Sequence, residues 1–176
     1  MERTGMYEFN PDYLSPKQLR ALDFAAERHQ QQTYGQSSIQ KPMPYLKHLV
    51  DVFLVAREYS AHHDILVSAL LHDVLEDIHT NRTELGILFG SHIARIVWKV
   101  TDEPGATRKE RKEATLEKTA SIAESRELKL YDRIANVRQR DKIDMYRKEQ
   151  EMFSDFLRMP NENTRAWFEL DKLLEI

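Results

Sequence analysis

The apolar stretch of residues 69–77 contains four acidic or imidazole side chains, His72, Asp73, Glu76 and Asp77. If the stretch is a helix, His72 and Glu76 lie one turn apart. Asp73 and Asp77 are related in the same way, so all four side chains project into roughly one quadrant. An adjacent His-Asp pair offers a neutral nitrogen and an anionic oxygen, which suit Mn, Fe, Mg or Zn. Two ligands seldom hold a metal, so further ligands must lie elsewhere.

Two other polar residues lie close to predicted core faces. His48 lies near the apolar face of a helix predicted to begin after Pro44, where a lone histidine is more often a core residue than a ligand. Asp132 lies beside the apolar positions of another predicted helix, which are Leu128, Leu130, Ile134 and Val137. A carboxylate so close to a core face needs a partner, either a cation such as Arg133 or a metal.

Helix signals recur along the chain and predict the elements that hold these residues. Ser15, Pro16 and Gln18 favour a helix start, and that helix is expected to run to about residue 30. Its apolar face is Leu19, Leu22 and Ala26, which we expect in the core. Further starts are expected after Pro44, at the caps Asp64 and Asn81, and at Ser91, with a stop at Phe89-Gly90.

The remaining segments are two loops, a charged run and two closing helices. Residues 31–44 form a long polar loop, either functional or disordered, and Pro104 and Gly105 break the chain within 101–107. The charged run 108–113 is either a solvated face or a source of phosphate contacts from Arg108, Lys109, Arg111 and Lys112. Amphipathic stretches at 145–157 and 164–174 close the chain, with Trp167 and Phe168 expected to pack inside.

Composition favours one helical domain. The chain has 176 residues, 41% hydrophobic and 31% charged, with only five glycines and six prolines. We therefore expect an all-α, single-domain fold over residues 1–176, with a core at about 15–140 and C-terminal helices at 141–176. The absence of cysteine excludes disulfides, thiolate zinc sites and cysteine nucleophiles.

Charge and hydropathy limit the partners. The net charge of −3 argues against a protein whose main task is to bind nucleic acid. No apolar run approaches the roughly 18 residues of a membrane span, and the first residues lack the apolar core of a signal peptide. We expect a cytoplasmic protein without a membrane partner. The sequence leaves the oligomeric state open, a homo-oligomer included.

Taken together, His48, His72-Asp73 and Asp132 form an H…HD…D pattern that resembles the HD-domain metal-dependent phosphohydrolase superfamily. Within it the likeness is to the hydrolase domain of the RelA/SpoT family and its stand-alone small alarmone hydrolases. The residues that carry the likeness are Pro44-Tyr45-Leu46-Lys47-His48, residues 69–77, Phe89-Gly90, Val100-Thr101-Asp102 and residues 129–136. The Glu-Asp pair that follows His-Asp after two residues is the discriminating feature.

The resemblance implies a reaction and a role for each residue. His48, His72, Asp73 and Asp132 would bind one Mn²⁺-like ion, Glu76 and Asp77 would position and deprotonate the attacking water, and Asn136 would contact the nucleotide. The reaction would be removal of the 3′-pyrophosphate from the alarmone guanosine tetra- or pentaphosphate, (p)ppGpp. About 40 residues follow Asn136, too few for the family's synthetase domain, so we expect a hydrolase only.

One segment departs from the family pattern. Members usually carry an arginine that stacks on the base shortly before the Pro-Tyr pair, and residues 32–41 contain none. Lys41 is the candidate to replace its charge and Tyr34 its stacking surface, and Arg133 is a further candidate substrate contact. Two alternatives therefore stay open. One is a related phosphohydrolase for another nucleotide, such as an adenosine analogue, NADPH or a nucleoside phosphate, and the other is a non-catalytic nucleotide-binding HD protein.

Overall fold

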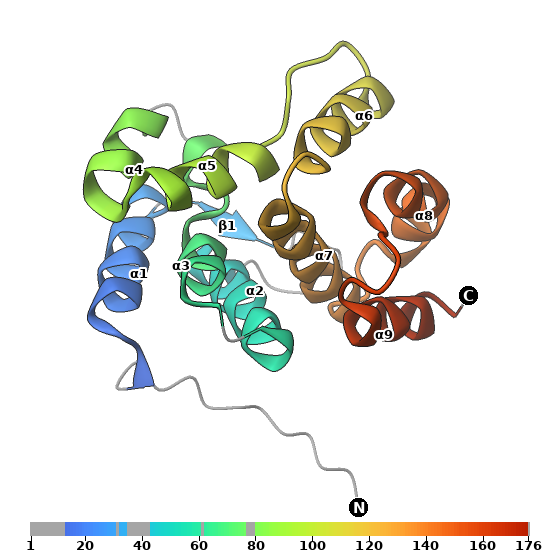
Figure 1. Ribbon diagram of the computed structural model, residues 1–176, viewed down its shortest axis with the longest axis horizontal. Coiled ribbons are helices and arrows are strands. Elements are labelled where there is room, and N and C mark those ends of the chain that lie inside the picture. The colour runs from blue at the N-terminus through green and yellow to red at the C-terminus, as the bar shows by residue number, and fades with distance from the viewer. Residues whose placement is uncertain (1–12, 31, 35–42, 61, 77–79, 176) are drawn as a thin grey trace, which may run out of the picture.

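The computed structural model describes residues 13–30, 32–34, 43–60, 62–76 and 80–175 (Figure 1). Within these ranges the chain is all-α, as predicted, apart from one pair of short strands. The helices are α1 (Pro16–Arg28), α2 (Leu46–Tyr59), α3 (His63–Leu71), the 3₁₀ turn η2 (Val74–Glu76), α4 (Arg82–Phe89), α5 (Ser91–Val100), α6 (Arg108–Thr119), α7 (Ala123–Arg138), α8 (Ile143–Leu157) and α9 (Thr164–Leu174). No helix in the described ranges is long and apolar enough to cross a membrane.

Local capping chemistry places several helix boundaries where the sequence predicts them. The Ser15 hydroxyl accepts from the Gln18 backbone N–H and the Ser15 N–H donates to the Gln18 side chain, which completes a capping box. Asn81 caps α4 by accepting from the Glu84 N–H at 3.0 Å. Gly90 joins α4 to α5 at a φ of +103°, a conformation that favours glycine.

Two predicted boundaries are wrong. Asp64 is not the cap of α3: His62 occupies that position, and Asp64 lies in the first turn, where an acidic side chain complements the helix dipole. Residues 69–77 do not form one helix either, because α3 ends at Leu71 and a 3₁₀ turn follows at η2.

The segment predicted as a long loop, residues 31–44, is not wholly irregular, since β1 (Thr33–Tyr34) pairs antiparallel with β2 (Met43–Pro44).

Helix α3 lies at the centre of the fold. It contacts α1, α2, α5 and α7, and Figure 1 shows it between α1 and α7. Its residues Ile65, Val67, Ser68, Ala69, Leu70 and Leu71 are all buried. A helix packed against several others is mostly apolar along its length, which explains why Ser68 is the one polar residue between Asp64 and His72.

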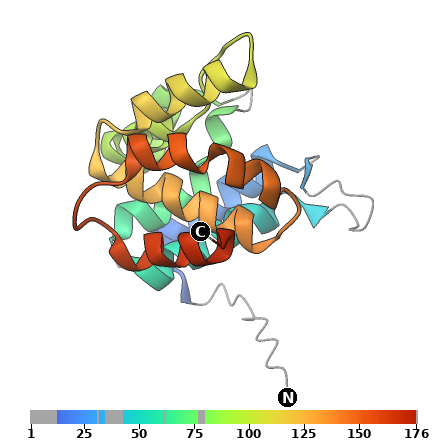
Figure 2. The same ribbon diagram turned by 90° about the vertical axis from the view of Figure 1, so that its right-hand side faces the viewer.

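The C-terminal helices pack against α6 and α7. Helix α8 contacts both, and α9 lies against α7, as the two views in Figures 1 and 2 agree. Trp167 is buried as predicted, but Phe168 is 71% exposed because the next position on the helix turns away from α7. Leu19 of α1 is likewise exposed, whereas Leu22 is buried and Ala26 half-buried. The buried face of α1 is Gln18, Ala21, Leu22 and Ala25.

Candidate metal centre

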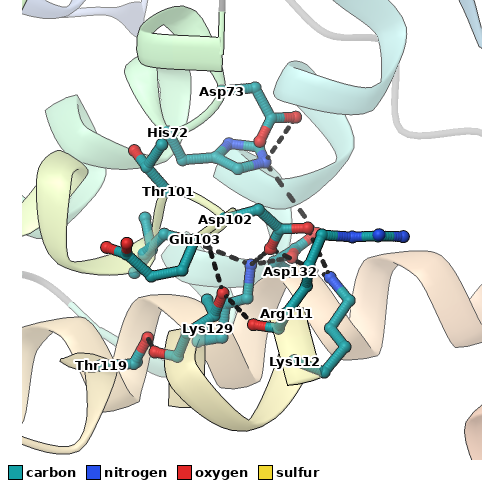
Figure 3. A network of polar contacts seen from close by, with 12 residues as sticks. His72, Asp73, Thr101, Asp102, Glu103, Arg111, Lys112, Thr119, Lys129 and Asp132 are labelled. Atoms are coloured by element: carbon teal, nitrogen blue, oxygen red, sulfur yellow. Dashed lines mark hydrogen bonds and ion pairs between the residues drawn. The ribbon is translucent and has the colours of Figure 1, made fainter. Parts of the chain in front are cut away.

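The four predicted metal ligands meet in the interior, although they come from three separate segments. His48 lies in the first turn of α2, His72 and Asp73 lie just after α3, and Asp132 lies in α7. His72 Nε2 is 3.3 Å from His48 Nε2 and 3.1 Å from Asp73 Oδ2. Asp132 Oδ1 is 3.4 Å from His48 Nε2 and 3.9 Å from His72 Nε2. Figure 3 shows His72 pointing toward both carboxylates.

This spacing fits a divalent ion. Ligands about 2.1 Å from a shared ion lie about 3.0 to 3.4 Å from one another in octahedral or tetrahedral geometry. The donor atoms of His48, His72 and Asp73 all lie within 4.8 Å of one another, with Asp132 beside the two histidines. Two imidazole nitrogens and two carboxylate oxygens suit Mn, Fe or Zn.

The backbone after α3 fixes the orientation of His72. Its Nδ1–H donates to the Ala69 carbonyl oxygen at 2.8 Å, because a carbonyl can only accept. Nε2 is therefore the nitrogen directed at His48, Asp73 and Asp132, an arrangement typical of histidine ligands to metals. This contact lies at the end of α3, where the chain turns from the helix into η2.

Electrostatics also make the cluster a cation site. Burial alone would raise the pKa of Asp73 and of Asp132, but His72 beside the first and Lys129 beside the second lower both values well below the usual range. Burial would lower the pKa of His72, yet the Asp73 and Asp132 carboxylates outweigh it and raise the value to about 9. Without an ion, a proton on His72 balances the two carboxylates, and a divalent ion would replace that proton.

Tyr45 belongs to the Pro44–His48 motif that carries the family resemblance, but the sequence analysis gave its side chain no role in the site. Its hydroxyl donates to Asp73 Oδ2 at 2.5 Å, and its ring stacks on the His29 ring with centroids 4.7 Å apart. Burial and the nearby Asp73 carboxylate raise the pKa of Tyr45, so the hydroxyl remains a donor. Its position three residues before His48 could have indicated this role, because residues three apart at the start of a helix lie on the same face.

Glu76 lies beside the cluster, in a geometry different from the predicted one. The η2 turn begins with a hydrogen bond from the Glu76 N–H to the Asp73 carbonyl at 3.0 Å. Residues three apart eclipse in a 3₁₀ turn, so Glu76 shares a side with Asp73 rather than with His72. Its Oε1 accepts from the Asp102 N–H at 3.2 Å. Partial desolvation and the Asp73 charge raise the pKa of Glu76. Asp77 lies outside the described residues.

Lys129, and not Arg133, is the cation beside Asp132. Lys129 Nζ is 3.5 Å from Asp132 Oδ2 and donates to the Val100 carbonyl at 3.1 Å. The two residues are three apart on α7 and so share a face, whereas Arg133, one position on, turns toward α8. Of the two partners that the sequence analysis left open for Asp132, a cation or a metal, the structure shows a cation, and it is Lys129 rather than the example Arg133. Lys129 also lies 4.0 Å from Asp102, whose carboxylate pairs with Lys112 (Figure 3).

A cavity of about 120 Å³ adjoins Asp132, where α6, α7 and α8 meet. It is lined by Arg108, Lys112, Thr115, Leu116, Lys129, Asp132, Arg133, Asn136, Tyr146, Glu149, Met152 and Phe153. The predicted substrate contacts Arg133 and Asn136 both line it, and Lys41 lies outside the described residues. Asn136 also donates to Asp132 Oδ1 at 2.6 Å, so its amide orients that carboxylate.

The charged run 108–113 is split between cavity and surface. Arg108 and Lys112 line the cavity, whereas Arg111 donates to the Gly105 carbonyl and Lys109 is exposed. The run is therefore partly a solvated face and partly the wall of a pocket beside the metal centre.

An all-α fold with two histidines and two aspartates around one point defines a helical metal-site protein of the HD type. A family model described as HD domain matches residues 21–153, and the chain belongs to this family. It is 32% identical over 129 residues to the guanosine-3′,5′-bis(diphosphate) 3′-pyrophosphohydrolase MESH1 of Drosophila melanogaster, covering 72% of this chain and 70% of that protein. The Homo sapiens MESH1 is 34% identical over 123 residues, covering 68% and 67%.

A solved structure agrees with these sequence relatives. It is described as a metazoan ortholog of SpoT that hydrolyses ppGpp, and it superposes with a TM-score of 0.78 at 27% sequence identity. The match covers 93% of this chain and 96% of that one. The likeness therefore extends beyond the metal centre to the C-terminal helices.

Proposed function

We propose that this chain is a metal-dependent guanosine-3′,5′-bis(diphosphate) 3′-pyrophosphohydrolase, which converts (p)ppGpp to GDP or GTP and pyrophosphate. The observation that carries the proposal is the convergence of His48, His72, Asp73 and Asp132 beside Glu76 and a cavity rich in cations. The two histidine Nε2 atoms are 3.3 Å apart, and each lies 3.1–3.9 Å from a carboxylate oxygen of Asp73 and of Asp132. The names of the MESH1 relatives support the choice of substrate.

The proposed cofactor is one divalent ion, Mn²⁺, held by those four residues. When bound, such an ion polarises a phosphoryl oxygen and lowers the pKa of a water molecule beside it. Tyr45 keeps Asp73 in place by donating to Oδ2, and Asn136 does the same for Asp132 by donating to Oδ1. Both contacts restrict the carboxylates to one orientation.

Glu76 is the proposed proton acceptor. Its raised pKa makes the carboxylate a better base than an ordinary glutamate, and the Asp102 N–H fixes one of its oxygens. Asp77 stays in the proposal as a second catalytic carboxylate on the strength of the family resemblance alone. Arg133, Asn136 and Lys41 stay as proposed substrate contacts, and Arg108 and Lys112 join them as cations on the cavity wall.

The proposal also includes a single domain over residues 1–176, a cytoplasmic location, and a nucleotide rather than nucleic acid as the ligand. The charge of −3 supports the choice of ligand. A homo-oligomer is compatible with the proposal.

The test is a product assay on purified protein with Mn²⁺, offering guanosine tetraphosphate, its adenosine counterpart, NADPH and a nucleoside monophosphate side by side. The proposal predicts GDP and pyrophosphate from the first substrate and no turnover by Asp73→Asn. Orthophosphate from NADPH, with no cleavage of the tetraphosphate, would reassign the substrate. Bound metal without cleavage of any substrate would make the chain a non-catalytic nucleotide-binding protein.

A further inference from the structure

One carboxylate joins two arginines at the outer end of the cavity. Glu149 of α8 accepts from Arg108 Nε of α6 at 2.7 Å, and its other oxygen is 3.6 Å from Arg133 Nη2 of α7. The three residues come from the three helices that wall the cavity, which lie together in Figure 1. The Glu149 side chain is only 16% exposed, so this is not an ordinary surface ion pair.

Arg133 is the buried member of the set. Its guanidinium lies over the rings of Tyr146 and Phe153, at 4.7 Å and 4.2 Å from their centroids. Its Nη1 is buried and has no hydrogen-bond partner in the part of the chain that the structure describes. A buried guanidinium normally satisfies its N–H groups, so this one has an unused capacity to bind an anion.

The cavity has the size and charge of a site for one phosphate group. Its volume of about 120 Å³ equals roughly four waters at about 30 Å³ each, far less than the roughly 300 Å³ or more of a pocket for a whole drug-sized ligand. Four cations line it, against the two carboxylates of Asp132 and Glu149. Lys112 and Lys129 already pair with Asp102 and Asp132, so the cations that Glu149 neutralises are Arg108 and Arg133.

We propose that Glu149 is a specificity-determining residue, because its carboxylate occupies the place between Arg108 and Arg133 that a substrate phosphate would otherwise take. A phosphate then enters this end of the cavity only by displacing an internal anion. A terminal phosphate, close to a dianion at neutral pH, can compete with a carboxylate for two arginines, whereas a singly charged phosphodiester competes poorly. Glu149 thus selects terminal phosphates over diesters. The inference rests on the proposed function in one respect, since it takes the phosphate that competes with Glu149 to be part of a nucleotide.

The direct test measures binding of small phosphates to the metal-loaded protein by calorimetry, without turnover. Wild type should bind methyl phosphate and not dimethyl phosphate. Glu149→Gln should bind methyl phosphate about tenfold more tightly and should gain measurable affinity for dimethyl phosphate. Glu151→Gln, an exposed position on the same helix, is the matched control and should behave as wild type. Equal or weaker phosphate binding in Glu149→Gln would overturn the proposal.

A second variant covers the case in which Glu149→Gln does not fold. Arg108 has a half-exposed side chain, so Arg108→Gln should fold normally and should bind methyl phosphate about tenfold more weakly. Unchanged affinity in Arg108→Gln would show that the Arg108–Glu149 pair only joins two helices. Because neither measurement needs hydrolysis, the result is independent of whether (p)ppGpp is the substrate.

In the hydrolysis assay Glu149→Gln should lower KM and leave kcat nearly unchanged.

Discussion

The metal centre and the cation-lined cavity meet at Asp132, yet the fold builds them in different ways. The metal centre uses α2, α3 and α7, the core helices, and His48 and His72 are 3% and 2% exposed. The cavity uses α6 and α8 against α7, and its ion pairs join helices that lie on one side of the molecule (Figure 1). The first region brings buried imidazoles and carboxylates together, whereas the second is built from ion pairs that Glu149 makes with arginines of two other helices. The difference separates a proposed catalytic centre fixed in the core from a proposed recognition site built on ion pairs between helices.

The largest effect is expected from removing a ligand of the fixed centre. Asp73→Ala should lose bound metal and should lower kcat/KM by at least about 10²-fold, because the remaining donors no longer surround an ion. Metal content by elemental analysis and the hydrolysis assay check both parts. Full metal occupancy in this variant would show that the ion binds elsewhere.

Glu76→Gln separates metal binding from proton transfer. The variant should keep its metal and lose about 10²-fold or more in kcat, since an amide cannot accept the proton from the attacking water. Loss of metal to the same extent as in Asp73→Ala would contradict the role given to Glu76.

A smaller effect is expected from loosening a ligand without removing it. Tyr45→Phe keeps the ring that stacks on His29 but loses the hydrogen bond to Asp73, so metal affinity should fall by about 10- to 100-fold. Competitive titration with a fluorescent chelator measures this change. Wild-type affinity in the phenylalanine variant would mean that packing alone positions Asp73.

The smallest effect is a pH dependence of the metal-free protein. The pKa of His72 rises from 6.5 to about 9 on folding, so the protonated form stabilises the fold fully below pH 6.5. This contribution is lost as the pH rises through 9. Chelator-treated protein should therefore melt at a lower temperature at pH 9 than at pH 6.5. His72→Gln should lose this trend, and a rising melting temperature in the wild type would contradict it.

Local chemistry made much of the fold predictable from the sequence. Ser15, Asn81 and Gly90 mark helix ends through contacts within three or four residues, so their signals can be read without the tertiary structure. The end of α3 at Leu71 could not be predicted in this way. His72 follows the last residue of α3 and faces His48, which is 24 residues away in sequence, and no local signal specifies that contact.

The site residues that were predicted also differ from those that were missed in how far their contacts depend on the tertiary structure. His48, His72, Asp73 and Asp132 were predicted as one set because their order in the sequence resembles the H…HD…D pattern of the HD-domain superfamily, and the structure brings them together. The choice between Lys129 and Arg133 as the partner of Asp132, and the exposure of Phe168, depend on which helix packs against which face. Sequence periodicity does not determine which helix packs against a given face. It also gives no indication that Glu149 reaches the cavity.

The most direct test of the account is a crystal structure of the Mn²⁺-loaded protein with anomalous data at the manganese edge. One anomalous peak is expected about 2.1 Å from Nε2 of His48, Nε2 of His72 and an oxygen each of Asp73 and Asp132. A peak that excludes Asp132, or an ion bound away from the histidines, would contradict the central claim that these four residues form one metal centre.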